Sequence, residues 1–170
     1  FSGDTVSFGI GQGFFLTTPL QLAHATAVIS QRGENFKPRV LYATEHPGTR
    51  VKTVEAPRPL PPVTVKNPRF WDAVITGMIH VVEGGTAHKI GAGAKYRIAG
   101  KTGTAQVFTL GQGERYNAKH LAKHLLDHAL FVAFAPAEDP RIAVAVIAEH
   151  GGGGSATAAP LARKVMDAWL

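Results

Sequence analysis

Four consecutive residues near the middle of the chain have side chains suited to binding an anionic peptide. They read Lys101-Thr102-Gly103-Thr104 and are followed by the apolar, β-prone sequence Ala105-Gln106-Val107. Lysine supplies a cation, the two threonines supply hydroxyl donors, and glycine leaves the backbone exposed. A ligand with a carboxylate and a peptide bond could therefore bind along this segment as an added strand. The alternative is a solvated surface turn, since glycine interrupts strands and lysine is normally exposed.

Three histidines at intervals of four residues are candidate metal ligands. His120, His124 and His128 would share one side of a helix if the helical piece predicted for residues 118–126 continued that far. Two histidines at i and i+4 can share a zinc ion. However, the glutamate of the metalloprotease pattern is missing and the chain has no cysteine. We therefore interpret the histidines as a solvated face, and we predict no metal and no other cofactor.

Two glycine-rich segments resemble nucleotide-binding loops only superficially. Gly9, Gly11 and Gly13 alternate along the chain, but they match neither G-x-G-x-x-G nor a loop with a Walker lysine. We predict a tight, buried loop there. The run 151–154 is four glycines without a following Lys-Ser/Thr, so we predict a flexible turn.

Composition limits the classes to which this chain can belong. Its 170 residues, 45% hydrophobic and 18% charged, fit one globular domain or a large piece of one. The net charge of +6 is spread over scattered lysines and arginines, which argues against a nucleic-acid partner. The longest apolar run, 129–135, is far shorter than the roughly 18–20 residues of a membrane span. The chain begins Phe-Ser-Gly-Asp without methionine, and we expect it to be a fragment.

Two helices are predicted in the first half of the chain. The first spans residues 19–31, with Thr18 as its cap and Gln21 completing a capping box, and it is apolar on nearly all sides. His24 within this helix fits a hydrogen-bonded core or cleft histidine better than a catalytic base. The second helix starts at Asn67-Pro68 and stops at Gly84-Gly85, with an apolar stripe suited to core packing.

Strands are predicted mainly in the second half. Residues 39–43 could form a strand at the start of an irregular, proline-rich surface stretch, and residues 96–109 form the strand that carries Lys101–Thr104. The runs 129–135 and 142–148 are apolar on both faces and joined by a short polar turn, which makes them antiparallel neighbours under helices on both sides. A final helix begins near Ser155 or Thr157 and reaches the end of the chain. The predicted class is α+β, with an antiparallel sheet flanked by helices on both faces.

The chain resembles a known family at several points, in a consistent order. Lys101-Thr102-Gly103-Thr104 resembles the third motif of penicillin-recognising serine transpeptidases and β-lactamases. Residues 9–13 followed by 18–21 resemble the stretch before a core helix in class B penicillin-binding proteins. Further segments resemble the elongation-specific, penicillin-binding protein 2 type: 86–89, 116–118, 127–128 and 149–154.

This resemblance implies a fold, a reaction and residue roles. In the family, a serine attacks the D-Ala-D-Ala end of a peptidoglycan stem peptide, and the acyl-enzyme then forms a cross-link with a neighbouring stem. β-Lactams mimic that peptide end and acylate the serine. By resemblance, Lys101 is catalytic and Thr102, Gly103 and Thr104 bind substrate. The backbone N–H of Thr104 is one oxyanion donor, and the second comes from the serine.

The family's nucleophile is missing from this chain. Its four serines stand at positions 2, 7, 30 and 155, and none has lysine three residues later. Ser2-Gly3-Asp4 superficially suggests the family's Ser-x-Asn motif but lies downstream of it in the family register. The resemblance therefore implies that residues 1–170 are the C-terminal part of a single transpeptidase domain, inactive without its N-terminal half.

The resemblance also implies partners and a location. Expected partners are the N-terminal half of the domain, peptidoglycan stem peptides, β-lactams and, for the full-length protein, elongation-complex membrane proteins. The expected location is the periplasmic face of the bacterial inner membrane, with an anchor upstream of this chain. The main alternative is a non-enzymatic module that binds peptidoglycan or a partner. A β-lactamase fits residues 1–30 and 110–154 less well, and a division-specific transpeptidase remains a further alternative.

Overall fold

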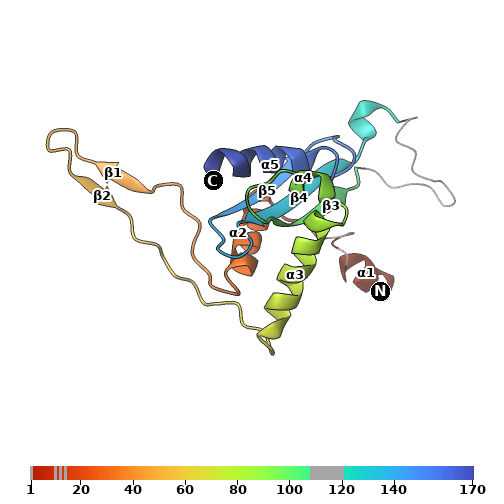
Figure 1. Cartoon of the computed structure of the whole chain (residues 1–170), viewed down its shortest axis with the longest axis horizontal. Helices are drawn as coiled ribbons and strands as arrows, with labels where there is room; N and C mark the ends of the chain where they lie inside the picture. The colour runs from red at the N-terminus through yellow and green to blue at the C-terminus, as the bar shows by residue number, and fades with distance from the viewer. Residues whose placement is uncertain (1, 10, 12, 14, 108–120) are drawn as a thin grey trace.

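A three-stranded antiparallel sheet forms the centre of the molecule (Figure 1). The computed structural model describes residues 2–9, 11, 13, 15–107 and 121–170. The strands are β3 (Ala99–Ala105), β4 (His128–Ala135) and β5 (Ile142–Ala148), in the order β3-β4-β5. The predicted pair of antiparallel apolar strands is therefore confirmed, with β4 starting one residue earlier than expected.

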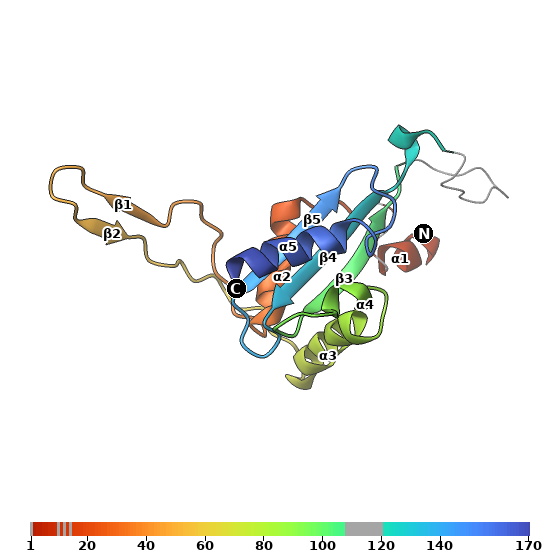
Figure 2. The same ribbon diagram turned by 45° about the horizontal axis from the view of Figure 1, so that its top comes forward.

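Helices cover both faces of this sheet, as predicted (Figures 1 and 2). On one face, Phe134 of β4 belongs to a core cluster with residues of α3 (Arg69–Glu83), and Ile29 of α2 (Pro19–Ser30) packs against that cluster. On the other face, Phe131 of β4 shares a cluster with Met166 of α5 (Ala158–Trp169). Phe131 and Phe134 are fully buried, so β4 is covered from both sides. The α+β class is confirmed.

The helix starts follow the predicted capping residues. The Gln21 backbone N–H donates to Thr18 Oγ1 at 3.2 Å, and the Thr18 N–H donates to Gln21 Oε1 at 2.8 Å, which is the expected capping box. Asn67 Oδ1 accepts a hydrogen bond from the Arg69 N–H at 3.0 Å at the start of α3. Burial of α2 is less complete than predicted, because Leu20 is 64% exposed while only one side of the helix meets the sheet.

A β-hairpin projects from the body between α2 and α3 (Figures 1 and 2). Its strands are β1 (Ala43–Glu45) and β2 (Lys52–Val54), which pair only with each other among the described strands. The strand predicted at 39–43 therefore lies too early in the chain, and the pairing with β2 was not predicted. Both strands are three residues long, which is too short for a clear alternating pattern.

Three local predictions are wrong. Residues Ser2–Gly9 form helix α1, and Gly9 and Gly11 are exposed instead of lying in a buried loop. A short helix, α4 (His88–Gly91), lies within residues 86–96, a segment of small residues for which the sequence predicts a loop. His124 lies in a 3-10 helix, Lys123–Leu125, and His128 already belongs to β4, so these two do not share a helix. His120 lies outside the described residues.

In the part of the chain that the structure describes, none of the helices combines the length and the apolar character needed to cross a membrane.

Candidate active site

The Lys-Thr-Gly-Thr segment, Lys101–Thr104, lies on an edge strand. It occupies β3, which runs over Ala99–Ala105 and is shorter than the predicted strand 96–109; residues 108 and 109 lie outside the described part. β3 pairs with β4 along one side, and none of the described strands pairs with its other side. That free side is called the open edge below. An extended peptide could add to it through backbone hydrogen bonds.

Side chains of this segment flank the open edge from both faces of the sheet. The register places Lys101 opposite Val132 and Thr102 opposite Phe131. Because successive residues of a strand alternate, the side chains of Lys101 and Thr102 point to different faces of the sheet. By the same alternation, Thr104 shares a face with Thr102. The Lys101 ammonium is exposed, and its Nζ donates to the Thr102 carbonyl at 2.8 Å. A peptide added at the edge would lie between a cation and two hydroxyl groups.

Thr86 is a site residue that the sequence analysis did not assign. Its Oγ1 lies 3.1 Å from Thr102 Oγ1, and either hydroxyl can be the donor. Thr86 sits in the turn between α3 and α4, sixteen residues before its partner. No spacing rule connects the two positions, although residues 86–89 were among the segments that carry the family resemblance.

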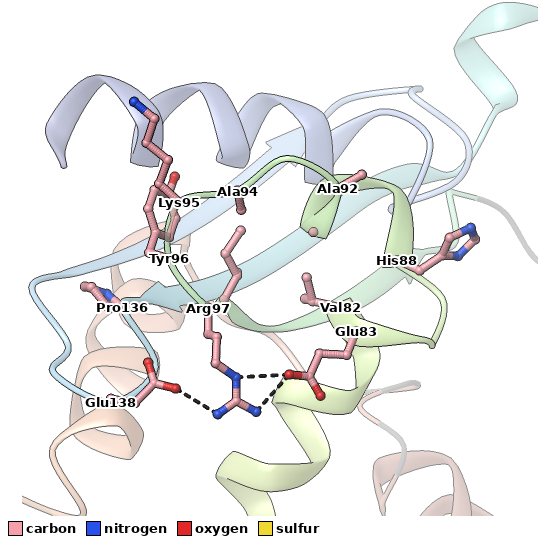
Figure 3. A pocket seen from close by; sticks show the side chains of 12 residues that line it. Val82, Glu83, His88, Ala92, Ala94, Lys95, Tyr96, Arg97, Pro136 and Glu138 are labelled. Atoms are coloured by element: carbon pink, nitrogen blue, oxygen red, sulfur yellow. Dashed lines mark hydrogen bonds and ion pairs between the residues drawn. The ribbon is translucent and has the colours of Figure 1, made fainter.

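Ion pairs fix the chain where it enters β3. Arg97 donates to Glu83 from Nε at 3.0 Å and from Nη2 at 2.8 Å, and to Glu138 from Nη1 at 2.8 Å (Figure 3). The hydrogen bond to Glu83, followed by that to Glu138, raises the pKa of Arg97 above its usual value. These pairs tie the end of α3 and the β4–β5 turn to the start of the strand.

The pocket drawn in Figure 3 has a volume of about 840 Å³ and lies apart from the Lys-Thr-Gly-Thr segment. Its lining comes from the end of α3, from α4 and from the chain that leads into β3, and it includes none of residues 101–104. Arg97 inside it is already neutralised by two carboxylates. We therefore assign the site from chemistry and strand geometry and not from cavity size.

A second polar link holds α5 to the same segment of chain. The Tyr96 hydroxyl donates to Asp167 Oδ1 at 2.6 Å, and Arg163 Nε donates to both Asp167 oxygens at 2.7 and 2.8 Å. Burial, with the hydrogen bond to Asp167, raises the pKa of Tyr96 to about 12. The same hydrogen bond, followed by Arg163, holds the pKa of Asp167 below its usual range. α5 thereby supports the residues just before β3.

Three of the described histidines, His24, His128 and His150, have structural partners. Among the described residues, no group of three or more His, Asp or Glu side chains could hold a metal ion. The backbone N–H of His150 donates to His128 Nδ1 at 2.9 Å. The two imidazole rings meet edge to face, with their centroids 4.8 Å apart. His24 Nε2 lies 2.9 Å from Asn35 Oδ1 in a partly buried position. This confirms the interpretation of His24 as a hydrogen-bonded histidine.

A comparison with known protein families identifies the family of this chain. The family model of the penicillin binding protein transpeptidase domain matches residues 1–167. The chain belongs to the penicillin-binding protein transpeptidase family. The resemblance inferred from the motifs, including its penicillin-binding protein 2 type, is confirmed by the relatives described next, and the family fold is confirmed with it.

Relatives within the family are similar along nearly the whole chain. The peptidoglycan D,D-transpeptidase MrdA of Haemophilus influenzae is 47% identical over 170 residues, which cover 99% of this chain and 26% of that protein. The crystal structure of Pseudomonas aeruginosa PBP2 in complex with WCK 5153 has a TM-score of 0.77 and 42% identity, covering 100% of this chain and 33% of that one. The Helicobacter pylori PBP2–MreC complex has a TM-score of 0.72 and 31% identity, covering 95% of this chain and 26% of that one. The chain thus spans about a quarter of the length of MrdA.

Proposed function

We propose that this chain belongs to a serine-type peptidoglycan D,D-transpeptidase and supplies the strand that holds the substrate. The observation that carries the proposal is the Lys-Thr-Gly-Thr segment at the open edge of β3, in a chain of the transpeptidase family. The substrate class is a stem peptide ending in D-Ala-D-Ala, and β-lactams are its covalent mimics. Relatives named D,D-transpeptidase support the reaction class.

Each residue of the segment has a role that its chemistry supports. The Lys101 ammonium attracts the substrate's terminal carboxylate and biases proton movement through a neighbouring hydroxyl. Thr102 and Thr104 donate charge-assisted hydrogen bonds to that carboxylate. Gly103 lets the substrate backbone lie close to the strand. The Thr104 N–H stabilises the oxyanion of the tetrahedral intermediate, together with an N–H of the serine.

The serine belongs to the rest of the domain, so residues 1–170 are the C-terminal part of one transpeptidase domain. Apolar side chains near the start of the chain support this, because they are open to solvent: Val6 71%, Leu16 92% and Leu20 64% exposed. Exposed apolar groups of this kind are typical of surfaces covered in the complete protein. β5 also pairs only with β4 among the described strands, which leaves that edge of the sheet available to further strands.

Membership of the family supports a proposed location and proposed partners. The full-length protein acts at the periplasmic face of the inner membrane, with its anchor upstream of this chain. It works with membrane proteins of the elongation complex, and the PBP2–MreC complex of Helicobacter pylori supports an association of that kind.

Labelled penicillin tests the proposal on two samples, the full-length protein and the 170-residue chain. We expect a stable covalent adduct on the full-length protein, and intact mass should show one label per molecule. The chain alone should remain at its own mass, near 18.0 kDa, because it contains no Ser-x-x-Lys. An unlabelled full-length protein would contradict the proposal and favour the non-enzymatic binding module.

A further inference from the structure

The glycine run after β5 is a hydrogen-bonded connection and not the flexible turn predicted from sequence. The Gly152 N–H donates to the Asp127 carbonyl at 2.9 Å, and the Thr157 hydroxyl donates to the Gly151 carbonyl at 2.8 Å. The Ala159 N–H donates to the Gly154 carbonyl at 2.9 Å and so joins the run to α5. Gly154 itself is buried.

Gly154 lies directly against the backbone of the Lys-Thr-Gly-Thr segment. A Cβ at this position would stand 2.7 Å from the Gly103 carbonyl oxygen, 3.2 Å from the Gly103 nitrogen and 2.3 Å from the Leu130 carbonyl oxygen. Gly103 and Leu130 face each other in the β3–β4 register, so one glycine contacts both strands at the same rung. Because these neighbours are backbone atoms, they cannot rotate away from an added methyl group as a side chain could.

We propose that Gly154 is a positioning residue. It determines how far the Gly103 peptide lies from the glycine run and, through that peptide, the direction in which the Thr104 N–H points. This inference rests on the proposed function, since it concerns the oxyanion donor of that reaction. Gly154 touches no reacting atom. It acts by allowing the glycine run to support β3 from the face opposite Lys101, at the residue between the two threonines.

The geometry indicates how large the effect should be. Moving the contact with Leu130 from 2.3 Å to an ordinary 3.4 Å requires a displacement of about 1 Å between the glycine run and the strands. Misplacing a catalytic group by that distance can cost roughly 100-fold in rate. The loss should fall on the acylation step, because the oxyanion donor acts in the transition state.

The test compares Gly154→Ala with a neighbouring glycine variant in the full-length protein. Gly153→Ala is the matched control, since its Cβ would meet nothing within 4 Å. For each variant, the rate of acylation by labelled penicillin is measured together with the amount labelled at saturation.

We expect Gly154→Ala to slow acylation by roughly 10- to 100-fold while most molecules still label at saturation. Gly153→Ala should acylate at the wild-type rate and label to the same extent. If Gly154→Ala reduces only the labelled fraction and not the rate, its role is merely structural and the inference is wrong. An unlabelled wild type would instead overturn the proposed function.

A second variant covers the case in which Gly154→Ala does not fold. Thr157→Val removes the hydroxyl that closes the turn on Gly151 and adds no bulk beside β3. It should loosen the support of Gly103 and slow acylation several-fold, with near-complete labelling at saturation. A wild-type acylation rate in Thr157→Val would contradict the proposed support.

Discussion

At the residue scale, the candidate site is a short segment of an edge strand, with side chains on both faces of the sheet and backbone groups at the open edge. Lys101 lies on one face of β3, Thr102 and Thr104 lie on the other, and the open edge lies between them. Thr86 adds a hydroxyl partner to Thr102. The arrangement suits a ligand that forms backbone hydrogen bonds in the plane of the sheet and places its carboxylate among the side chains.

The hydroxyl contact between Thr86 and Thr102 is expected to contribute to acylation. Thr86→Val removes the hydroxyl that orients Thr102 but keeps the side-chain shape. A hydrogen bond of this kind contributes about 0.5–1.5 kcal/mol, so we expect a roughly 2- to 10-fold lower second-order rate of acylation by penicillin. Thr44→Val on the exposed hairpin strand β1 is the control and should have no effect. Equal rates for both variants would remove Thr86 from the site.

At this scale, the sequence predicted the residues that carry recognisable chemistry and missed those that act by shape. Lys101–Thr104 stands out because a lysine, two hydroxyls and a glycine lie together. Thr86 has no distinctive spacing, and its contact with Thr102 depends on how α3 and α4 turn in space. Gly154 was interpreted as a flexible position because a glycine run has no side chains to indicate which backbone it approaches.

At the scale of elements, β4 is the strand that holds the site in place. It pairs with β3 on one side and with β5 on the other, and its side chains enter both core clusters. Phe131 lies opposite Thr102, and its ring end would be 2.5 Å from a Cβ at Gly100. The shape of β3 therefore depends on this aromatic side chain.

Phe131→Ala should destabilise the domain strongly. Phe131 is fully buried, and truncating a buried phenylalanine costs about 3–5 kcal/mol. Phe70→Ala on α3 is the control, because Phe70 is 56% exposed and should lose far less. Urea unfolding of the full-length protein measures both free energies. Similar losses for the two variants would contradict the core described above.

The link between Tyr96 and Asp167 predicts how stability changes at alkaline pH. The pKa of Tyr96 is about 12 in the folded protein, against 10.0 without its surroundings. Its contribution is therefore complete below pH 10 and is lost as the pH rises from 10 toward 12. Thermal unfolding of wild type and Tyr96→Phe should converge over this range, whereas Tyr42→Phe on the hairpin should show no such trend. A constant difference between wild type and Tyr96→Phe would refute the link.

The helices and strands that have strong local sequence signals were predicted correctly. The capping box at Thr18 and the two long apolar strands were found because capping chemistry and continuous apolar runs act over a few residues. α4 was missed because it is four residues long and rich in small side chains. His128 would have shared a helix face with His124 only if the helix predicted for residues 118–126 had continued, but pairing with Ala105 places His128 on β4.

At the scale of the whole molecule, the hairpin makes little contact with the body that carries the site. Figures 1 and 2 show the β1–β2 hairpin extending away from the sheet that carries the site. Its two strands contact each other, and neither has more than marginal contact with the sheet or helices of the body. The hairpin therefore does not position the Lys-Thr-Gly-Thr segment.

Removing the hairpin tests this separation. Replacing residues 40–56 by a short Gly-Ser linker in the full-length protein should leave the rate of penicillin acylation and the thermal unfolding midpoint unchanged. The physical reason is that little buried apolar area is lost. Slower acylation after the deletion would show that the hairpin supports the site.

The central claim is that Lys101 holds the substrate and assists its reaction at the open edge of β3. Its most direct test is the rate of acylation by labelled penicillin in full-length wild type, Lys101→Ala and the control Lys164→Ala, which removes an exposed lysine from α5. We predict a loss on the order of 100-fold or more for Lys101→Ala, and the wild-type rate for Lys164→Ala. Acylation of Lys101→Ala at the wild-type rate would contradict the account.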